Sequence, residues 1–76
     1  MSANSVMIEL TPDEALVFFD WLARFNAGTT GMFEDQAEER VLWNLEATLE
    51  RVLVEPFAAN YGELLGQARE RVRDRE

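Results

Sequence analysis

Three of the residue types that carry most side-chain chemistry are missing, because the 76 residues of this chain include no cysteine, histidine or lysine. Disulfides are excluded, and the usual zinc sites have no ligands. The common general bases, thiol nucleophiles and Schiff-base amines are absent as well. The only serines lie within the first five residues, with no base to activate them. We therefore expect no catalytic residue, no cofactor and no metal ligand, and interpret the chain as a protein that is not an enzyme.

Long apolar runs are also missing. The longest, residues 15–19, is far shorter than the roughly 20 residues that span a bilayer. Residues 1–5 lack the charged start and the apolar stretch of a secretory signal. These features predict a cytoplasmic protein without membrane contact, and the lack of cysteine fits a reducing compartment.

Basic residues are few: seven arginines stand against fifteen acidic residues, a net charge of −8. Such a surface repels phosphate backbones, so we expect no direct contact with nucleic acid. It suits a basic protein partner, and a protein of this kind could also mimic nucleic acid. The simplest interpretation is that the acidity keeps a small protein in solution.

The length of 76 residues predicts one small domain over 1–76, and small domains are often completed by oligomerisation. The pattern predicts a mainly α (α+β) fold: a frayed N-terminus over 1–5, a strand over 6–10, and helices over about 12–26, 34–54 and 60–74. In the strand, Val6, Ile8 and Leu10 alternate onto one face. A lone strand needs a ladder partner, which is either segment 30–33 or the same strand of a second chain.

The first helix has a clear start and an unusually wide apolar surface. Thr11 and Glu14 form a predicted capping box around Pro12. The apolar arc spans about 200°, whereas a helix resting on one core needs about 100°. This helix is therefore buried on two sides, either within one chain or partly against another subunit, with Trp21 near the polar edge.

The second helix carries two apolar strips on opposite sides. The wider one predicts the core and comprises Val41, Leu42, Leu45, Leu49, Val52 and Leu53. The narrower one, Trp43, Ala47 and Val54, favours a partner contact at the tryptophan. Four acidic residues begin the helix. They are Glu34, Asp35, Glu38 and Glu39. They indicate a solvated helix start, and weak binding of a divalent cation is the alternative.

Pro56 ends the second helix, and Asn60 with Glu63 predicts a capping box for the third. The apolar stripe of the third helix consists of Tyr61, Leu64, Leu65, Ala68 and Val72.

Three runs of the sequence, IELTPDEALVFFDWL from Ile8, FEDQAE from Phe33 and LWNLE from Leu42, carry a resemblance. Over residues 8–68 the chain resembles a group of small uncharacterised bacterial proteins with no assigned function. The resemblance implies a bacterial, cytosolic protein and transfers no catalytic residue.

We interpret the chain as a small homodimeric protein-protein interaction module without catalysis. The candidate interface residues are Val6, Ile8, Leu10, Trp21, Trp43, Ala47 and Val54. The alternative is an acidic regulator that binds a basic protein, in the manner of an antitoxin or a nucleic-acid mimic. An enzyme or metal-binding protein is the third hypothesis.

Overall fold

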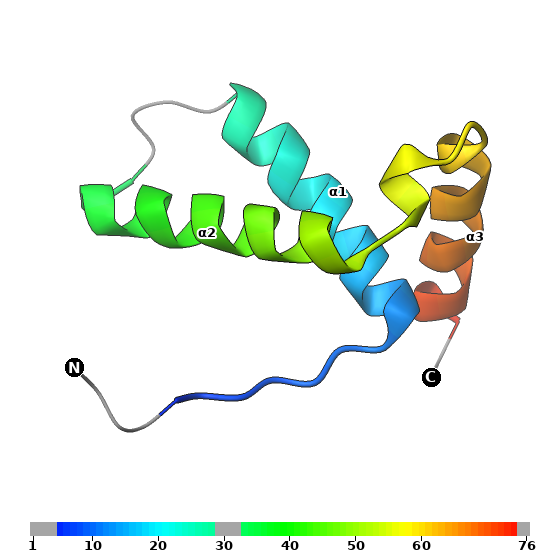
Figure 1. The fold of residues 1–76 in the computed structure, drawn as a ribbon, viewed down its shortest axis with the longest axis horizontal. Helices are drawn as coiled ribbons and strands as arrows, with labels where there is room; N and C mark the ends of the chain where they lie inside the picture. Colours follow the sequence, from blue (N-terminus) through cyan, green and yellow to red (C-terminus); the bar gives the residue numbers. More distant parts are fainter. Residues whose placement is uncertain (1–4, 29–32, 75–76) are drawn as a thin grey trace.

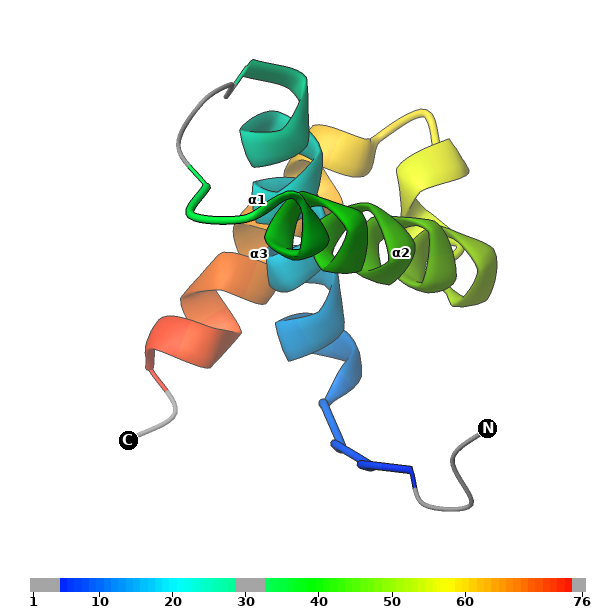
Figure 2. The same cartoon turned by 90° about the vertical axis from the view of Figure 1, so that its left-hand side faces the viewer.

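The computed structural model describes residues 5–28 and 33–74. Within them lie the α-helices α1 (Pro12–Gly28), α2 (Gln36–Val52) and α3 (Tyr61–Arg73), and a short 3-10 helix, η1 (Glu55–Phe57). Figure 1 shows α2 crossing in front of α1, with α3 at the far end of the molecule, and Figure 2 gives the view along α2. The prediction of a mainly α-helical chain is confirmed.

The start of α1 is held by the predicted capping box. The Glu14 N–H donates to Thr11 Oγ1 at 3.1 Å, and the Thr11 N–H donates to Glu14 Oε1 at 2.9 Å. Both bonds satisfy donors that a helix start leaves without intrahelical partners. The helix continues to Gly28, beyond the end expected near residue 26.

Helix α2 is shorter than the predicted 34–54 because both ends are capped inside that range. The Asp35 carboxylate accepts a hydrogen bond from the Ala37 N–H at 2.7 Å, which fixes the N-terminus. At the other end Leu53 turns to extended backbone. The chain then forms η1 around Pro56.

The capping box predicted at the start of α3 is wrong. The Asn60 side chain makes no capping hydrogen bond, and its backbone angles of −104° and 38° are not the extended ones that a capping side chain needs. The Asn60 carbonyl instead accepts from the N–H groups of Glu63 at 3.0 Å and Leu64 at 3.1 Å. Backbone geometry in the preceding turn therefore decides this helix start.

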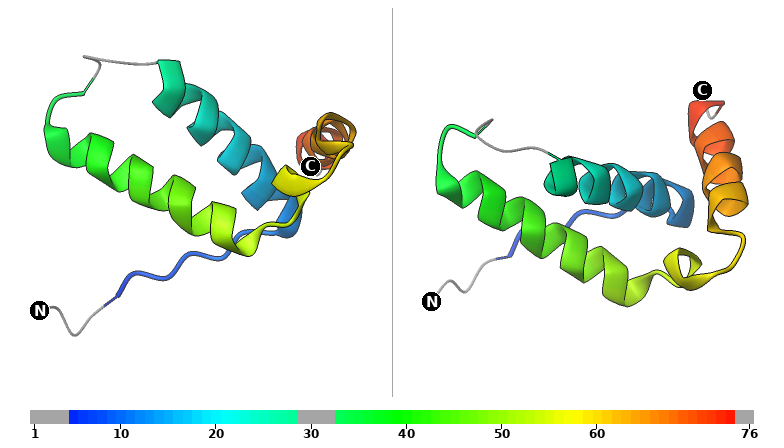
Figure 3. Two further views of the ribbon diagram at one scale, coloured as in Figure 1. Left: turned by 45° about the horizontal axis from the view of Figure 1, so that its top comes forward. Right: turned by 90° about the horizontal axis from the view of Figure 1, so that it is seen from above.

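The core lies around α1, which packs against α2 on one side and α3 on another, as its wide apolar arc predicted. Figure 3 shows α1 and α2 side by side, with α3 crossing near the start of α1. Leu22 of α1 has no exposed surface. The other buried residues are Ala15, Leu16, Phe19, Leu53, Leu65 and Ala68.

The predicted core stripe of α2 is only half right. Leu53 is buried and Leu42 and Leu49 are half-buried, but the other three, Val41, Leu45 and Val52, are exposed. No residue of α2 itself is buried. The reason is that α1 alone packs along α2, whereas α3 packs against α1 and η1.

The segment expected as a strand, residues 6–10, forms no strand within the described part of the chain. It leads away from α1 and passes below α2 in the view of Figure 1. Its apolar side chains are strongly exposed, Val6 at 90% and Ile8 at 79%. The other predicted ladder partner was segment 30–33, and its residues 30–32 lie outside the described residues. Within the described part of the chain the segment therefore has no ladder partner.

Candidate interaction surfaces

The acidic start of α2 is occupied by local hydrogen bonds. Asp35 caps the helix, and the Glu34 N–H donates to Glu38 Oε1 at 3.0 Å. Within residues 5–28 and 33–74, no three acidic side chains gather into a group that could hold a metal ion. None of the helices found there is long and apolar enough to cross a membrane.

Charged side chains fasten α3 to α1. The Asp20 carboxylate accepts hydrogen bonds from the Tyr61 hydroxyl at 2.8 Å, from Arg24 Nε at 2.8 Å and from Arg69 Nη2 at 3.1 Å. Asp13 accepts two bonds from Arg71, at 2.8 and 2.9 Å. The bonds from Tyr61, Arg69 and Arg71 join α3 to α1 and give the contact between these helices a fixed geometry.

The contact with Asp20 shifts two pKa values. Partial burial alone would raise the pKa of Asp20, but hydrogen bonds from Arg24 and Tyr61 and the charge of Arg69 outweigh it and lower the pKa. Burial, together with the hydrogen bond to Asp20, raises the pKa of Tyr61 to about 12. Both shifts favour the state in which neutral tyrosine donates to an ionised carboxylate.

The hydrogen-bonded pair of Tyr61 and Asp20 predicts a loss of stability at alkaline pH. Because lysine, cysteine and histidine are absent, Tyr61 is the only side chain expected to titrate between about pH 7 and pH 12. The folded chain keeps a proton that the unfolded chain loses near pH 10, so stability falls as pH rises from about 10 to 12. We expect urea denaturation to show a loss on the order of 1–2 kcal/mol over this interval. Tyr61→Phe should be less stable at neutral pH and lack this loss, and an equal loss in both proteins would contradict the assignment.

An apolar groove lies between the N-terminal segment, α1 and α2. It has a volume of about 510 Å³. Thr48 is the one polar residue in its lining, which otherwise consists of Ile8, Leu10, Phe18, Leu45 and Leu49. Leu10 and Leu45 keep 41% and 38% of their surface exposed, so the groove is open to solvent.

A row of aromatic rings continues the groove along α1. The ring centroids of Phe18 and Trp21 lie 6.5 Å apart, those of Trp21 and Phe25 4.8 Å apart, and Phe33 meets Phe25 edge-on at 5.7 Å. Trp21 keeps 43% of its surface exposed. We call the groove lining together with this tryptophan the groove face.

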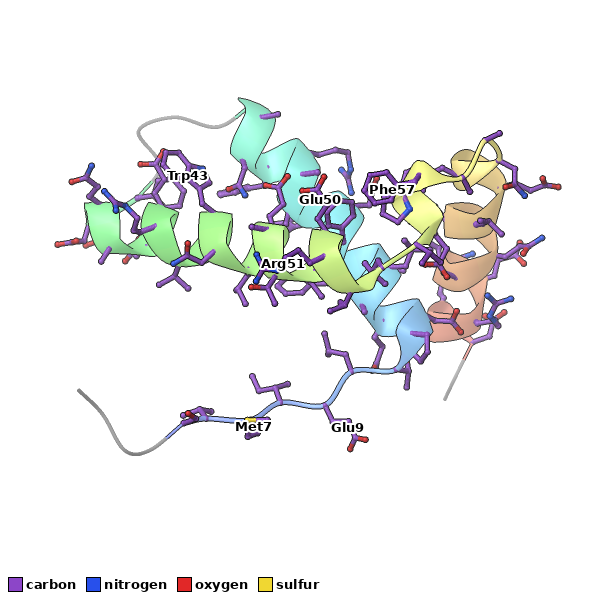
Figure 4. All side chains as sticks on the ribbon, viewed as in Figure 1. Met7, Glu9, Trp43, Glu50, Arg51 and Phe57 are labelled. Carbon is purple, nitrogen blue, oxygen red and sulfur yellow. The ribbon has the colours of Figure 1, made fainter. Side chains whose placement is uncertain are left out.

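A second exposed surface lies on the opposite side of α2. It consists of Trp43 and Ala47 of α2 with the exposed Val54 and Phe57 of the segment that follows the helix, and we call it the Trp43 face. Figure 4 shows Trp43, Glu50 and Phe57 above α2, whereas Met7 and Glu9 lie below it. Helical spacing puts Glu39, Glu46 and Glu50 along one edge of this face. Glu46 Oε1 also accepts a hydrogen bond from Asn26 at 2.7 Å.

The seven candidate interface residues thus divide between two surfaces. Ile8, Leu10 and Trp21 lie on the groove face, next to Val6 on the same segment. Trp43 and Ala47 lie on the Trp43 face along α2, whereas Val54 joins it from beyond the helix end, because α2 stops at Val52 and helical spacing no longer applies to residue 54. The sequence-based prediction missed Phe18, Leu45 and Phe57 as surface residues. The signal for Phe18 and Leu45 was that α1 and α2 carry more apolar positions than α3 can cover.

No family model, no curated protein and no solved structure matches the chain. The two surfaces are therefore the features of the described residues that indicate a function. Both combine aromatic and aliphatic side chains, which is the composition of the centres of protein interfaces.

Proposed function

We propose that this protein is a non-catalytic interaction module that works as a homodimer, joined through the groove face. The observation that carries the proposal is the N-terminal segment. Its apolar side chains are exposed, and the backbone of residues 6–10 makes no hydrogen bond within the described part of the chain. Exposed apolar side chains and an unpaired extended backbone together are typical of a strand that pairs with another chain.

A second copy is the occupant that this segment fits. The apolar residues on one face of this segment are placed symmetrically about Ile8, with Val6 before it and Leu10 after it. An antiparallel pair with a two-fold axis at Ile8 puts Val6 of each copy opposite Leu10 of the other. The same arrangement places Val6, Ile8 and Leu10 of both copies on one face and gives the backbone its ladder partners.

The groove supplies the packing that such a pair needs, because a two-stranded ribbon alone is marginal in water. Ile8 and Leu10 already contribute to the groove with Phe18 and Leu45. Pairing brings the apolar side chains of the second copy to the open side of the same groove. By symmetry both grooves are covered at once, which explains why each chain leaves this face exposed. The resemblance to small bacterial proteins extends the proposal to the bacterial cytoplasm.

Solution mass tests this proposal. Light scattering after size exclusion should give about twice the 8.7 kDa chain mass over a range of protein concentrations. The mass should persist at high salt, because apolar burial rather than charge holds the copies together. The variant Trp43→Phe leaves Trp21 as the sole indole, and its emission should shift to the blue as the dimer forms. The mass of one chain at every concentration would overturn the proposal.

A further inference from the structure

We propose that the Trp43 face binds an amphipathic helix of another protein, one that carries basic residues along one edge of its apolar stripe. This inference goes beyond self-association, since the face lies on the opposite side of α2 from the groove. It holds whether or not two copies pair.

The apolar part of the face has the size of a helix-binding site. Trp43, Val54 and Phe57 expose 48%, 76% and 73% of their surfaces. Residues 43–52 span about 14 Å along α2, which matches two to three turns of a docked helix, and Val54 and Phe57 follow beyond the helix end. An exposed indole at one end and an exposed phenyl ring at the other supply the kind of anchors that dominate binding energies.

The charge around the face indicates a basic partner. Residues 34–55 contain seven acidic residues and two arginines, a balance of −5. The ion pairs of the described residues all involve Asp13 or Asp20 of α1, and none involves a carboxylate of α2. Among the described residues no ion pair therefore neutralises the carboxylates of α2, and their charge would attract a basic helix.

The two edges of the face also set the orientation of the partner. Glu39, Glu46 and Glu50 line one edge, whereas Arg40 and Arg51 lie on the other. Basic residues of the partner fit along the glutamate edge, and the arginines repel the reversed placement. A second copy docked antiparallel through this face would bring the two glutamate edges together, so charge disfavours that self-contact.

A single-tryptophan variant provides the test, because each face contains one of the two tryptophans of the chain. Trp21→Phe leaves Trp43 as the sole indole. This variant is titrated with a synthetic helical peptide of about 18 residues, which has a leucine stripe and arginines along one edge of that stripe. The control peptide has glutamate in place of each arginine. We expect a blue shift of Trp43 emission with the arginine peptide only, and an affinity that falls at least about tenfold from 0.05 to 0.5 M salt.

Charge reversal on the protein locates the contact. Glu50→Arg in the Trp21→Phe background should weaken peptide binding by about tenfold. Glu70→Arg makes the same charge change on exposed α3 and should leave binding nearly unchanged. Ile8→Glu should leave peptide binding intact even where it separates the dimer, so failure of this inference is distinguishable from failure of the proposed homodimer.

Four outcomes would overturn the inference. They are no emission shift with the arginine peptide, equal shifts with both peptides, equal losses in the two charge-reversal variants, and a blue shift of Trp43 that depends on protein concentration without peptide. The last outcome would identify a second copy as the occupant of the Trp43 face.

Discussion

Leu22→Ala is expected to lower the free energy of unfolding by about 3–5 kcal/mol, in the upper part of the range for leucine-to-alanine changes in cores. Leu22 has no exposed surface, and it lies in the middle of α1, the helix against which both others pack. The stability of a domain this small is on the order of 4–11 kcal/mol, so the loss is a large fraction of the total. Urea denaturation followed by circular dichroism measures it.

Leu45→Ala is the matched control, because it removes the same atoms from an exposed position. In a single chain it should cost less than about 1 kcal/mol, since 38% of the leucine surface is in water. If the groove is covered by a second copy, this cost should grow with protein concentration. Equal losses from the two substitutions at low concentration would show that the burial of Leu22 does not govern stability.

The features that could be predicted from the sequence are the local ones. The capping box between Thr11 and Glu14 forms because both partners lie within one turn of helix. The apolar stripe of α3 also packs as its spacing indicated, with Leu65 and Ala68 buried. Each of these outcomes depends on residues close in sequence, so periodicity and capping rules were sufficient.

The features that could not be predicted depend on which helix packs against which. Leu42 and Leu45 belong to one apolar strip, but only the side of α2 that faces α1 is covered. Hydrophobic periodicity predicts that a strip is apolar, but it does not predict how much of that strip a neighbouring helix covers. For the same reason the candidate interface residues could be identified one by one, while their division into a groove face and a Trp43 face required the structure.

The distribution of polar contacts adds to this division. The Asp20–Arg69 and Asp13–Arg71 ion pairs hold α3 on α1, so these helices are fixed to each other by charge as well as by packing. Helix α2 has no ion pair within the described residues and no buried residue. The helix with the least internal support thus carries parts of both open surfaces. This is consistent with a helix whose packing is completed by partner chains.

Ile8→Glu is expected to convert the dimer to single chains. In one chain Ile8 is 79% exposed, so the substitution should change the stability of the monomer by less than about 0.5 kcal/mol. In the proposed ribbon the two copies of this residue face each other on the axis, against the apolar groove. Two carboxylates would then meet in a site that excludes water, which costs far more than an exposed charge. Light scattering should show a mass near 8.7 kDa with unchanged helical content.

Two variants with an uncharged polar side chain distinguish pairing as a strand from a general effect of lost apolar surface. Ile8→Gln and Met7→Gln place the same side chain at neighbouring positions that are similarly exposed, at 79% and 87%. Alternation turns Ile8 toward the groove and Met7 away from it, so only Ile8→Gln should weaken the dimer. Equal weakening by both would mean that the segment associates without forming a strand. If neither had an effect on the mass of a dimer, the contact between copies would lie elsewhere, and the groove would be open to another partner.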